Sequence, residues 1–564
     1  MFKVTCYKLY NPCYNFLNLL RIMKEQKLER FKNHWIHSSV VYQIYPLSFK
    51  DSNADGKGDL GGIIEKLDYL NDGKESLGIK AVWISPVYKS PMIDGGYDIS
   101  DYYDIDPLFG DIKTFDRLVS ELHRRKMKLI VDLVGNHTSF AHPWFVEARS
   151  SRDNPKRDWY IWKDPKPDGS PPNNWLSVFG GSAWIYEKAS GQYCLHSFMP
   201  TQPDLNWKNP EVQSEMKKIM EFWIGRGVDG FRVDALYHFI EDSLYRDDPP
   251  NPDFIPGDDP YKSLLHIHSK GQAELPEAMK IFREIIAEHK DIFIVSEVYA
   301  PVPKLKEMYA ICPGEQYAPF NFNLIGLPWK ASAYKKSIDE FEKVLVLEET
   351  PTYVLGNHDL SRVRTRLGKE CSRLAAFLLF TLRGVPFVYY GDEIGMKDEK
   401  IPYEKVQDAA ERETPGFQLG RDPGRTPMQW DDSQYAGFSA AEPWLPLGEN
   451  WKTDNVKSQD VNPKSILSMY RTLIHFRNGS IVLQRGKYVP LTSRSEDVFS
   501  FLREYGNERL LVVANFSNDT VEETLPNGQV KIIVSSYLDR RSEEVSGTLI
   551  TLRPQEGYLL EITK

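Results

Sequence analysis

The sequence of 564 residues predicts an α/β protein: a (β/α)8 TIM barrel with an inserted subdomain after strand 3 and a C-terminal antiparallel β-sandwich domain. Three observations predict this fold. Eight short runs rich in β-branched and aromatic residues alternate with amphipathic helical patterns, as in a parallel barrel. The interval between the third and fourth runs is too long for one crossover. After about Gly486, only short strands separated by turn residues follow.

The predicted barrel strands are near-continuous apolar runs, which strands buried on both faces of a sheet require. They are residues 40–45, 81–85, 129–134, 231–234, 292–297, 321–325, 353–356 and 385–390. Helical periodicity lies between them. Phe115, Leu118, Val119 and Leu122 form one apolar stripe, and residues 212–224 follow the same pattern.

Two long intervals interrupt the alternation. Residues 137–207 are rich in Trp, Pro, Asn and Gly, and we expect them to form the inserted subdomain B. Residues 245–262 are rich in Pro and Asp and predict a long loop after the fourth strand, of the kind that often shapes a site.

The domain boundaries follow from these intervals. We expect an N-terminal extension (1–34), a catalytic barrel (35–136 and 208–486), subdomain B (137–207) and a C-terminal β domain (487–564). Within the last domain, strands are predicted at residues 498–503, 510–514, 530–534 and 557–562.

Composition narrows the class of protein. Hydrophobic residues make up 41% and charged residues 26%, which is ordinary for a globular protein, and the net charge of −9 argues against a nucleic-acid partner. No apolar run is long enough to span a bilayer, so we expect no membrane partner. The oligomeric state is left open.

Cysteine usage points to a reducing compartment. The five cysteines are widely spaced and odd in number, which favours free thiols and a cytoplasmic location. Secretion is the alternative, favoured weakly by Asn-X-Ser/Thr triplets at Asn478, Asn515 and Asn518. The mildly hydrophobic stretch 5–23 is a poor secretory signal, and Met23 offers an alternative start.

Three carboxylates end predicted strands. Asp234, Glu297 and Asp359 follow the fourth, fifth and seventh runs, so in a barrel they would meet at one rim. Breaking a glycosidic bond needs two carboxyls, one to attack or activate water and one to protonate the leaving oxygen. Arg232 lies two residues before Asp234 on the same face of the strand and would keep Asp234 ionised; a structural ion pair is the alternative.

Two histidines accompany these acids. His137 follows the third run and His358 directly precedes Asp359. Either imidazole could bind a sugar hydroxyl, although a histidine taken alone is more often structural.

An acidic loop predicts a metal site. Asp51, Asn53, Asp55 and Asp59 present oxygen atoms at spacings typical of the first half of a calcium loop. A complete EF-hand would need Glu where Gly62 stands. We therefore expect a structural Ca²⁺ or Mg²⁺, with a solvated acidic turn as the alternative, and no cofactor for the chemistry.

Together these motifs resemble the α-amylase family of glycoside hydrolases, in its branch of exo-acting α-glucosidases and oligo-1,6-glucosidases. The resemblance runs from about His34 to the C-terminus. Besides Glu297, it rests on residues 41–46 (VYQIYP), 94–102 (DGGYDISDY), 136–139 (NHTS), 202–207 (QPDLNW), 230–235 (GFRVDA), 356–359 (GNHD) and 425–430 (RTPMQW).

The resemblance implies a retaining exo-α-glucosidase acting on small oligosaccharides or disaccharides. It implies that Asp234 is the nucleophile, Glu297 the acid/base and Asp359 a stabiliser of the transition state. Glu297 has no basic neighbour in sequence, so we expect a raised pKa that suits an acid. The resemblance also implies a set of glucose-binding residues: Tyr97 stacking on the terminal glucose, His137 and His358 binding its hydroxyls, Asp94 and Arg425 closing the far end of the pocket, and Phe179 lining it.

Ala235 bears on linkage. Relatives that favour α-1,6 bonds typically have Val after the nucleophile, whereas small residues accompany α-1,4 preference. The resemblance therefore favours maltose or sucrose over isomaltose. A glucosyl-transferring enzyme or a sucrose isomerase on the same fold is the alternative, because such enzymes keep the same three acids. A non-enzymatic transporter subunit is disfavoured by the intact acids and the lack of a membrane helix.

Overall fold

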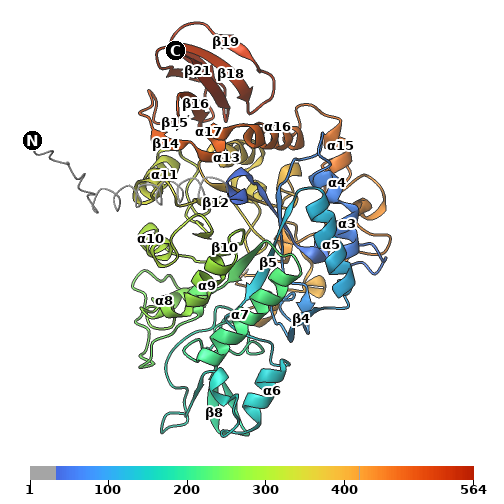
Figure 1. The fold of residues 1–564 in the computed structure, drawn as a ribbon, viewed down its shortest axis with the longest axis vertical. Coiled ribbons are helices and arrows are strands. Elements are labelled where there is room, and N and C mark those ends of the chain that lie inside the picture. Colours follow the sequence, from blue (N-terminus) through green and yellow to red (C-terminus); the bar gives the residue numbers. More distant parts are fainter. Residues whose placement is uncertain (1–33, 418, 564) are drawn as a thin grey trace, which may run out of the picture.

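The structure is a computed structural model that describes residues 34–417 and 419–563 (Figure 1). The predicted extension 1–34, except for His34, lies outside the described residues, as do Cys6 and Cys13. Within the described part, no helix is long and apolar enough to cross a membrane. The three cysteines there, Cys194, Cys312 and Cys371, are free thiols.

Eight parallel strands form the central sheet, as predicted. They are β1 (Val41–Ile44), β2 (Ala81–Ile84), β5 (Lys128–Val134), β9 (Gly230–Asp234), β10 (Phe293–Ser296), β11 (Tyr317–Pro319), β12 (Thr352–Val354) and β13 (Val385–Tyr389). Their order is β11-β10-β9-β5-β2-β1-β13-β12. A parallel bridge between Asn321 and Tyr353 joins the two ends of the sheet, and the Asn321 N–H donates to the Thr352 carbonyl at 3.1 Å, which closes the barrel.

The predicted position of the sixth strand is wrong. That strand is β11, three residues long, and the expected segment 321–325 is mostly turn. Asn321 takes part only in the closing bridge. Because Tyr317, Ala318 and Pro319 form so short a run, it carries little periodic signal, whereas the longer run that follows has more apolar residues.

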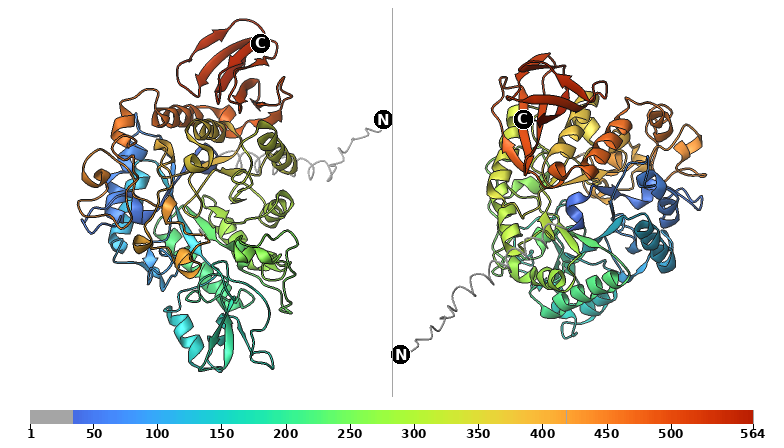
Figure 2. Two further views of the ribbon diagram at one scale, coloured as in Figure 1. Left: turned by 180° about the vertical axis from the view of Figure 1, so that it is seen from behind. Right: turned by 45° about the horizontal axis from the view of Figure 1, so that its top comes forward.

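Helices surround the barrel (Figures 1 and 2). The longer ones are α5 (Ile112–Arg124), α7 (Pro210–Gly225), α9 (Lys280–Glu288), α10 (Val302–Ile311), α11 (Ala331–Val344), α13 (Lys369–Thr381) and α16 (Ile466–Gly479). In α5 the Asp111 side chain caps the helix by accepting from the Thr114 N–H. The predicted stripe of α5, from Phe115 to Leu122, is buried as expected.

The chain between β5 and α7 forms a separate small unit at one end of the molecule (Figure 1). It contains α6 (Pro143–Ser150) and a three-stranded antiparallel sheet of β6 (Trp162–Lys163), β8 (Gln192–Leu195) and β7 (Trp184–Glu187). The loop after β9 packs against it, because the Asn174 side chain donates to the Asp248 carbonyl at 2.8 Å and the Trp175 indole to the Arg246 carbonyl at 2.9 Å.

The C-terminal β domain lies at the opposite end (Figure 2). Its six-stranded antiparallel sheet contains β14 (Lys487–Pro490), β15 (Val498–Tyr505), β16 (Glu508–Asn515), β18 (Gln529–Ser535), β19 (Glu543–Val545) and β21 (Gly557–Thr563). A second sheet pairs β17 (Val521–Thr524) with β20 (Leu549–Leu552). An apolar core that includes Leu511, Ile532 and Ile550 joins the two sheets. Helix α13 is buried against this domain, where a Cβ at Gly557 would lie 2.6 Å from Phe377.

Candidate active site

The three predicted acids lie at the carboxyl ends of barrel strands. Asp234 is the last residue of β9, Glu297 follows β10, and Asp359 lies five residues after β12. Since all eight strands are parallel, these ends share one rim of the barrel. The rim carries the candidate site.

Arg232 joins two of the acids. Its Nη1 lies 2.6 Å from Asp234 Oδ1, and its Nη2 lies 2.7 Å from Glu297 Oε2. The guanidinium is buried and also lies 2.6 Å from Oδ1 of Asp132, a residue of β5. Asp132 in turn accepts a hydrogen bond from the Trp83 indole at 2.7 Å. One buried cation therefore holds three carboxylates, and Asp132 is absent from the predicted site.

Burial is the largest influence on the pKa values of Asp234 and Glu297. Burial raises the pKa of Asp234 to about 7, although Arg232 opposes the shift. Burial also raises the pKa of Glu297 to about 7, again against Arg232, with the charges of Asp234 and Asp359 adding to the rise. The rise expected for Glu297 is present, but Glu297 does have a basic partner, supplied by the fold. Arg232, which we expected to keep Asp234 ionised, does oppose the rise in the pKa of Asp234, but its guanidinium is shared among three carboxylates.

The backbone after Asp234 is in an uncommon conformation. Ala235 has φ of 45° and ψ of 35°, in the left-handed region. Its N–H donates to Glu297 Oε2 at 3.1 Å. The strained turn therefore orients the second carboxyl of the pair.

Asp359 is surrounded by cations. Arg425 Nη2 lies 2.9 Å from its Oδ1, and Arg421 Nη1 lies 3.4 Å from the same atom. Burial alone would raise the pKa of Asp359, but the positive charges of Arg421 and Arg425 hold it well below its usual value. Asp359 is therefore a carboxylate at neutral pH.

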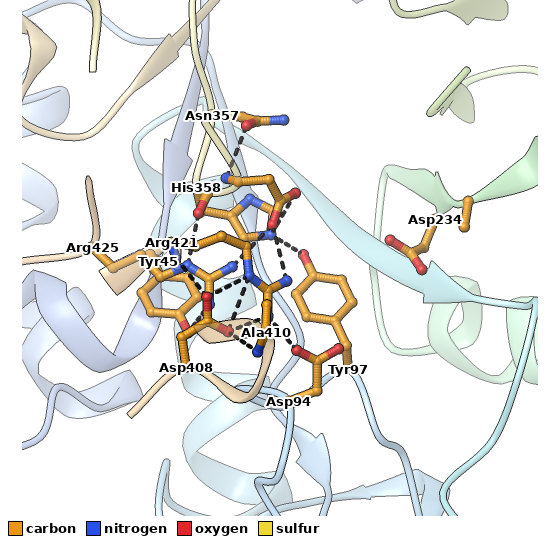
Figure 3. Close-up of polar contacts among 12 residues, drawn as sticks. Tyr45, Asp94, Tyr97, Asp234, Asn357, His358, Asp408, Ala410, Arg421 and Arg425 are labelled. Atoms are coloured by element: carbon orange, nitrogen blue, oxygen red, sulfur yellow. Dashed lines mark hydrogen bonds and ion pairs between the residues drawn. The ribbon is translucent and has the colours of Figure 1, made fainter. Parts of the chain in front are cut away.

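His358 is held in one tautomer. Its Nδ1 lies 2.7 Å from the Gln43 amide nitrogen, which can only donate, so Nδ1 accepts and Nε2 carries the proton. Nε2 lies 2.7 Å from the Tyr97 hydroxyl, and the two rings stack with centroids 5.3 Å apart (Figure 3). Burial lowers the pKa of His358 well below its usual value, so the ring is neutral.

Asp94 and Arg425, which we expected to bind the outermost sugar hydroxyl, have different partners. Asp94 Oδ1 lies 2.6 Å from Arg421 Nη2 (Figure 3). Arg425 points toward the barrel, where its Nε donates to the His358 carbonyl at 2.7 Å. The second oxygen of Asp94 accepts from Gln202 at 2.9 Å, so Asp94 is held from both sides.

The remaining predicted residues lie around this cluster. The Arg421 guanidinium lies over the Phe179 ring, 5.0 Å from its centroid. His137 is buried with its ring centroid 5.2 Å from that of Phe198, and burial lowers its pKa to about 3, so it too is neutral. Phe179 therefore lies beside Arg421, the cation that pairs with Asp94.

Carboxylate oxygens of the predicted metal loop accept hydrogen bonds from backbone N–H groups of the same loop. Asp51 Oδ1 accepts from the Asn53 and Ala54 N–H groups at 2.9 and 2.8 Å, and Asp55 Oδ1 accepts from the Lys57 N–H at 2.8 Å. Among the described residues, no group of three or more His, Cys, Asp or Glu side chains is arranged to hold a metal ion. The donors are hard oxygens, which suit Ca²⁺ or Mg²⁺ by type.

Sequence reasoning missed several residues of the site, namely Gln43, Asp132, Asp408 and Arg421. Arg421 stands four positions before Arg425, and that closeness was a usable signal because both arginines flank one short turn. Asp408, which holds Arg421, lies in a stretch with no recognisable pattern.

Comparison with known proteins agrees with this geometry. Residues 43–486 match the family model of the α-amylase catalytic domain, and residues 498–556 match the C-terminal domain of the α-amylase SusG. The chain is 38% identical to an oligo-1,6-glucosidase of Parageobacillus thermoglucosidasius, over 94% of this chain and 99% of that one. It is also 38% identical to an α-glucosidase of Culex pipiens, over 94% and 91%.

A solved structure shows the same framework. The crystal structure of an α-glucosyl transfer enzyme superposes with a TM-score of 0.88 at 37% identity, over 94% of this chain and all of that one. The chain therefore belongs to the α-amylase family of glycoside hydrolases, in its branch of α-glucosidases and oligo-1,6-glucosidases.

Proposed function

We propose that the protein is a retaining exo-α-glucosidase, which releases glucose from the non-reducing end of short α-glucosides through a covalent glucosyl-Asp234 intermediate. One observation carries the proposal: Asp234 and Glu297 are held on the two terminal nitrogens of the Arg232 guanidinium. Retaining glycosidases keep their two carboxyls about 5–5.5 Å apart, and bridging by one guanidinium favours so short a separation.

In the first step the Asp234 carboxylate attacks the anomeric carbon while Glu297 gives its proton to the leaving oxygen. The glycosidic bond breaks, and an ester links glucose to Asp234. In the second step Glu297 takes a proton from water, the resulting hydroxide attacks the same carbon, and Asp234 leaves as a carboxylate. The raised pKa of Glu297 suits the first role, because an acid near pH 7 must start protonated.

The other residues bind the glucose unit. Asp359 is a carboxylate that would accept hydrogen bonds from sugar hydroxyls, and His358 would orient the Tyr97 hydroxyl, which its Nε2 contacts at 2.7 Å. Tyr97 and Phe179 offer ring faces to the sugar. The ion pair of Asp94 with Arg421 closes the far end, which restricts the pocket to a terminal unit.

We further propose that α-1,4 bonds, as in maltose, or sucrose are favoured over α-1,6 bonds. The proposal rests on Ala235, whose small side chain follows the nucleophile and leaves room beside the scissile bond. The relatives named above include an oligo-1,6-glucosidase and an α-glucosidase. Their names therefore do not indicate which linkage this protein prefers.

Product analysis tests the proposal. The protein is incubated with maltose, isomaltose, sucrose and trehalose, and products are followed by chromatography. We expect free glucose from maltose, no turnover by Asp234→Ala, and unchanged turnover by Asp253→Ala, an exposed acid in the loop after β9. Absence of glucose from every substrate would contradict the proposal.

A second candidate is a glucosyl-transferring enzyme or a sucrose isomerase, in which a sugar replaces water as acceptor. It is favoured by Tyr299, two residues after Glu297, which is 52% exposed and stacks on Phe322 with ring centroids 4.3 Å apart. Such a platform would suit an acceptor sugar. The likeness to an α-glucosyl transfer enzyme points the same way. An isomerised disaccharide or a longer oligosaccharide as main product would establish this candidate instead.

We also propose that residues 51–59 hold a structural Ca²⁺ or Mg²⁺. The donor set supports it, because three carboxylates and one amide lie within nine residues of chain. Asp51 and Asp59 are buried while Asn53 and Asp55 are exposed, so the loop has both anchored and accessible oxygens.

A further inference from the structure

A cavity lies next to the residues that form the proposed end of the sugar pocket. It has a volume of about 590 Å³, within the range of ligand-binding pockets. Its lining includes Tyr45, Gly95, Asp408, Ala409 and Trp444. Aromatic rings, a carboxylate and small residues together are the kinds of surface that a pyranose ring contacts. We call this space the rear cavity.

One layer of side chains separates the rear cavity from the site. Gly95 lines the cavity and directly follows Asp94 in the chain. Tyr45, also in the lining, stacks on His358 with ring centroids 5.8 Å apart. Arg425 touches both sides, since it lines the cavity and lies 2.9 Å from Asp359.

Asp408 holds Arg421 in place, and Arg421 forms part of the layer between the site and the rear cavity. Arg421 donates to Asp408 from Nε at 3.0 Å and from its backbone N–H at 2.6 Å, and Nη2 lies 2.5 Å from Asp408 Oδ1. The same Nη2 reaches Asp94 at 2.6 Å. Figure 3 shows Asp408 and Asp94 on neighbouring sides of the Arg421 guanidinium, with Asp234 well away from them.

Asp408 is itself fixed. It is 4% exposed, and Oδ1 accepts from the Ala410 N–H at 3.3 Å at the start of α14 (Ala409–Glu413). Without Asp408, the Arg421 guanidinium would retain two contacts: the ion pair with Asp94 and the longer contact of 3.4 Å with Asp359. A long, flexible side chain held by fewer bonds spends less time in one position.

We propose that Asp408 is a positioning residue that sets the length of the sugar pocket by holding Arg421 against Asp94, and that without this hold the pocket continues into the rear cavity. The rear cavity would then accept one further α-linked glucose unit on the non-reducing side of the scissile bond. The inference rests on the proposed exo-α-glucosidase activity. It identifies Asp408 as the residue that, through Arg421, restricts cleavage to the terminal glucose.

A blocked substrate tests the inference. A p-nitrophenyl maltoheptaoside whose terminal glucose carries a 4,6-ethylidene group cannot enter a pocket closed at the terminal unit. We expect the wild-type chain to leave it uncut and Asp408→Ala and Arg421→Ala to cut it at least tenfold above the wild-type background. The same variants should lose about 10- to 100-fold in kcat/KM for maltose, as expected when a buried charged hydrogen bond of ~1.5–3 kcal/mol is removed.

Two further variants separate positioning from simple loosening. Adding Ala409→Trp to Asp408→Ala fills the rear cavity and should abolish the gained activity. Glu413→Ala removes a second carboxylate of the cavity lining and should leave the blocked substrate uncut, because Glu413 makes no ion pair with Arg421 in the described structure. Thermal melting establishes that each variant is folded.

If the Asp408→Ala variant has no measurable turnover, a binding measurement still tests the inference. Calorimetry with the blocked oligosaccharide compares Asp234→Asn with Asp234→Asn/Asp408→Ala, and only the double variant should bind. Folded variants that neither cut nor bind the blocked substrate would overturn the inference. Failure of the proposed function looks different, because then the wild-type chain would release no glucose from maltose.

Discussion

Arg232 Nη1 lies 2.6 Å from Asp132 Oδ1, and both side chains are buried, with exposed fractions of 1% and 0%. Asp132 binds no sugar in the proposed mechanism, yet it holds the cation that orients Asp234 and Glu297. Asp132 also has its own support, the hydrogen bond from the Trp83 indole, so Arg232 is held from behind.

Asp132→Asn should therefore lower kcat on the order of 10- to 100-fold with little change in KM. A charged hydrogen bond is worth ~1.5–3 kcal/mol, and each 1.36 kcal/mol of barrier is tenfold in rate. Steady-state kinetics on maltose measures it, with the exposed Asp253→Asn as control. A large rise in KM at constant kcat would contradict a role through Arg232.

Asp234→Asn should stabilise the protein at pH 8 more than at pH 5. Burial raises the pKa of Asp234 to about 7, whereas the unfolded chain has an Asp pKa of about 3.9. Between these values the folded state holds a proton that the unfolded state releases, so this group's contribution to the free energy of unfolding falls as the pH rises. Asn is neutral throughout and avoids the buried charge at pH 8.

Thermal melting at the two pH values measures this effect. We expect a gain in Tm of a few degrees at pH 8 and a gain less than half as large at pH 5, with no such difference between the two pH values for Asp253→Asn. Equal gains at both pH values would mean that Asp234 is ionised across the whole range.

Ala235→Val should shift preference from maltose toward isomaltose. A β-branched side chain beside the nucleophile takes up room next to the scissile bond. It also strains a left-handed residue, at a cost of about 1–2 kcal/mol. The measurement is the ratio of kcat/KM for the two disaccharides. Ala235→Gly is the matched control, since it keeps the room and relieves the strain, and it should leave the ratio unchanged.

Added Ca²⁺ or Mg²⁺ should raise Tm if residues 51–59 bind it. At a concentration 100 times Kd, one bound ion stabilises the folded state by about 2.7 kcal/mol. Melting after treatment with a chelator, and again after each metal is restored, measures the effect. Asn53→Ala/Asp55→Ala removes two donors on the exposed side and should abolish the rise. An equal rise in that variant would place the ion elsewhere.

The sequence predicted much of the fold because barrel strands are near-continuous apolar runs and their order along the chain is local information. It predicted three acids at one rim for the same reason, since parallel strands bring their carboxyl ends together. The sixth strand was misplaced because Tyr317–Pro319 is too short to show a period. The C-terminal strands were found through their alternation and turns.

By itself, then, the amino-acid sequence determined the barrel, the C-terminal β domain and the positions of Asp234, Glu297 and Asp359 on strand ends. Only the tertiary structure decided which cation meets which carboxylate. Asp132 and Arg232 lie on different strands, and Asp94 and Arg421 are more than 300 residues apart. Such pairs leave no periodic trace, because buried charges find partners in space and any nearby segment can supply them. For this reason the sequence alone did not show that Arg421, rather than Arg425, forms the ion pair with Asp94.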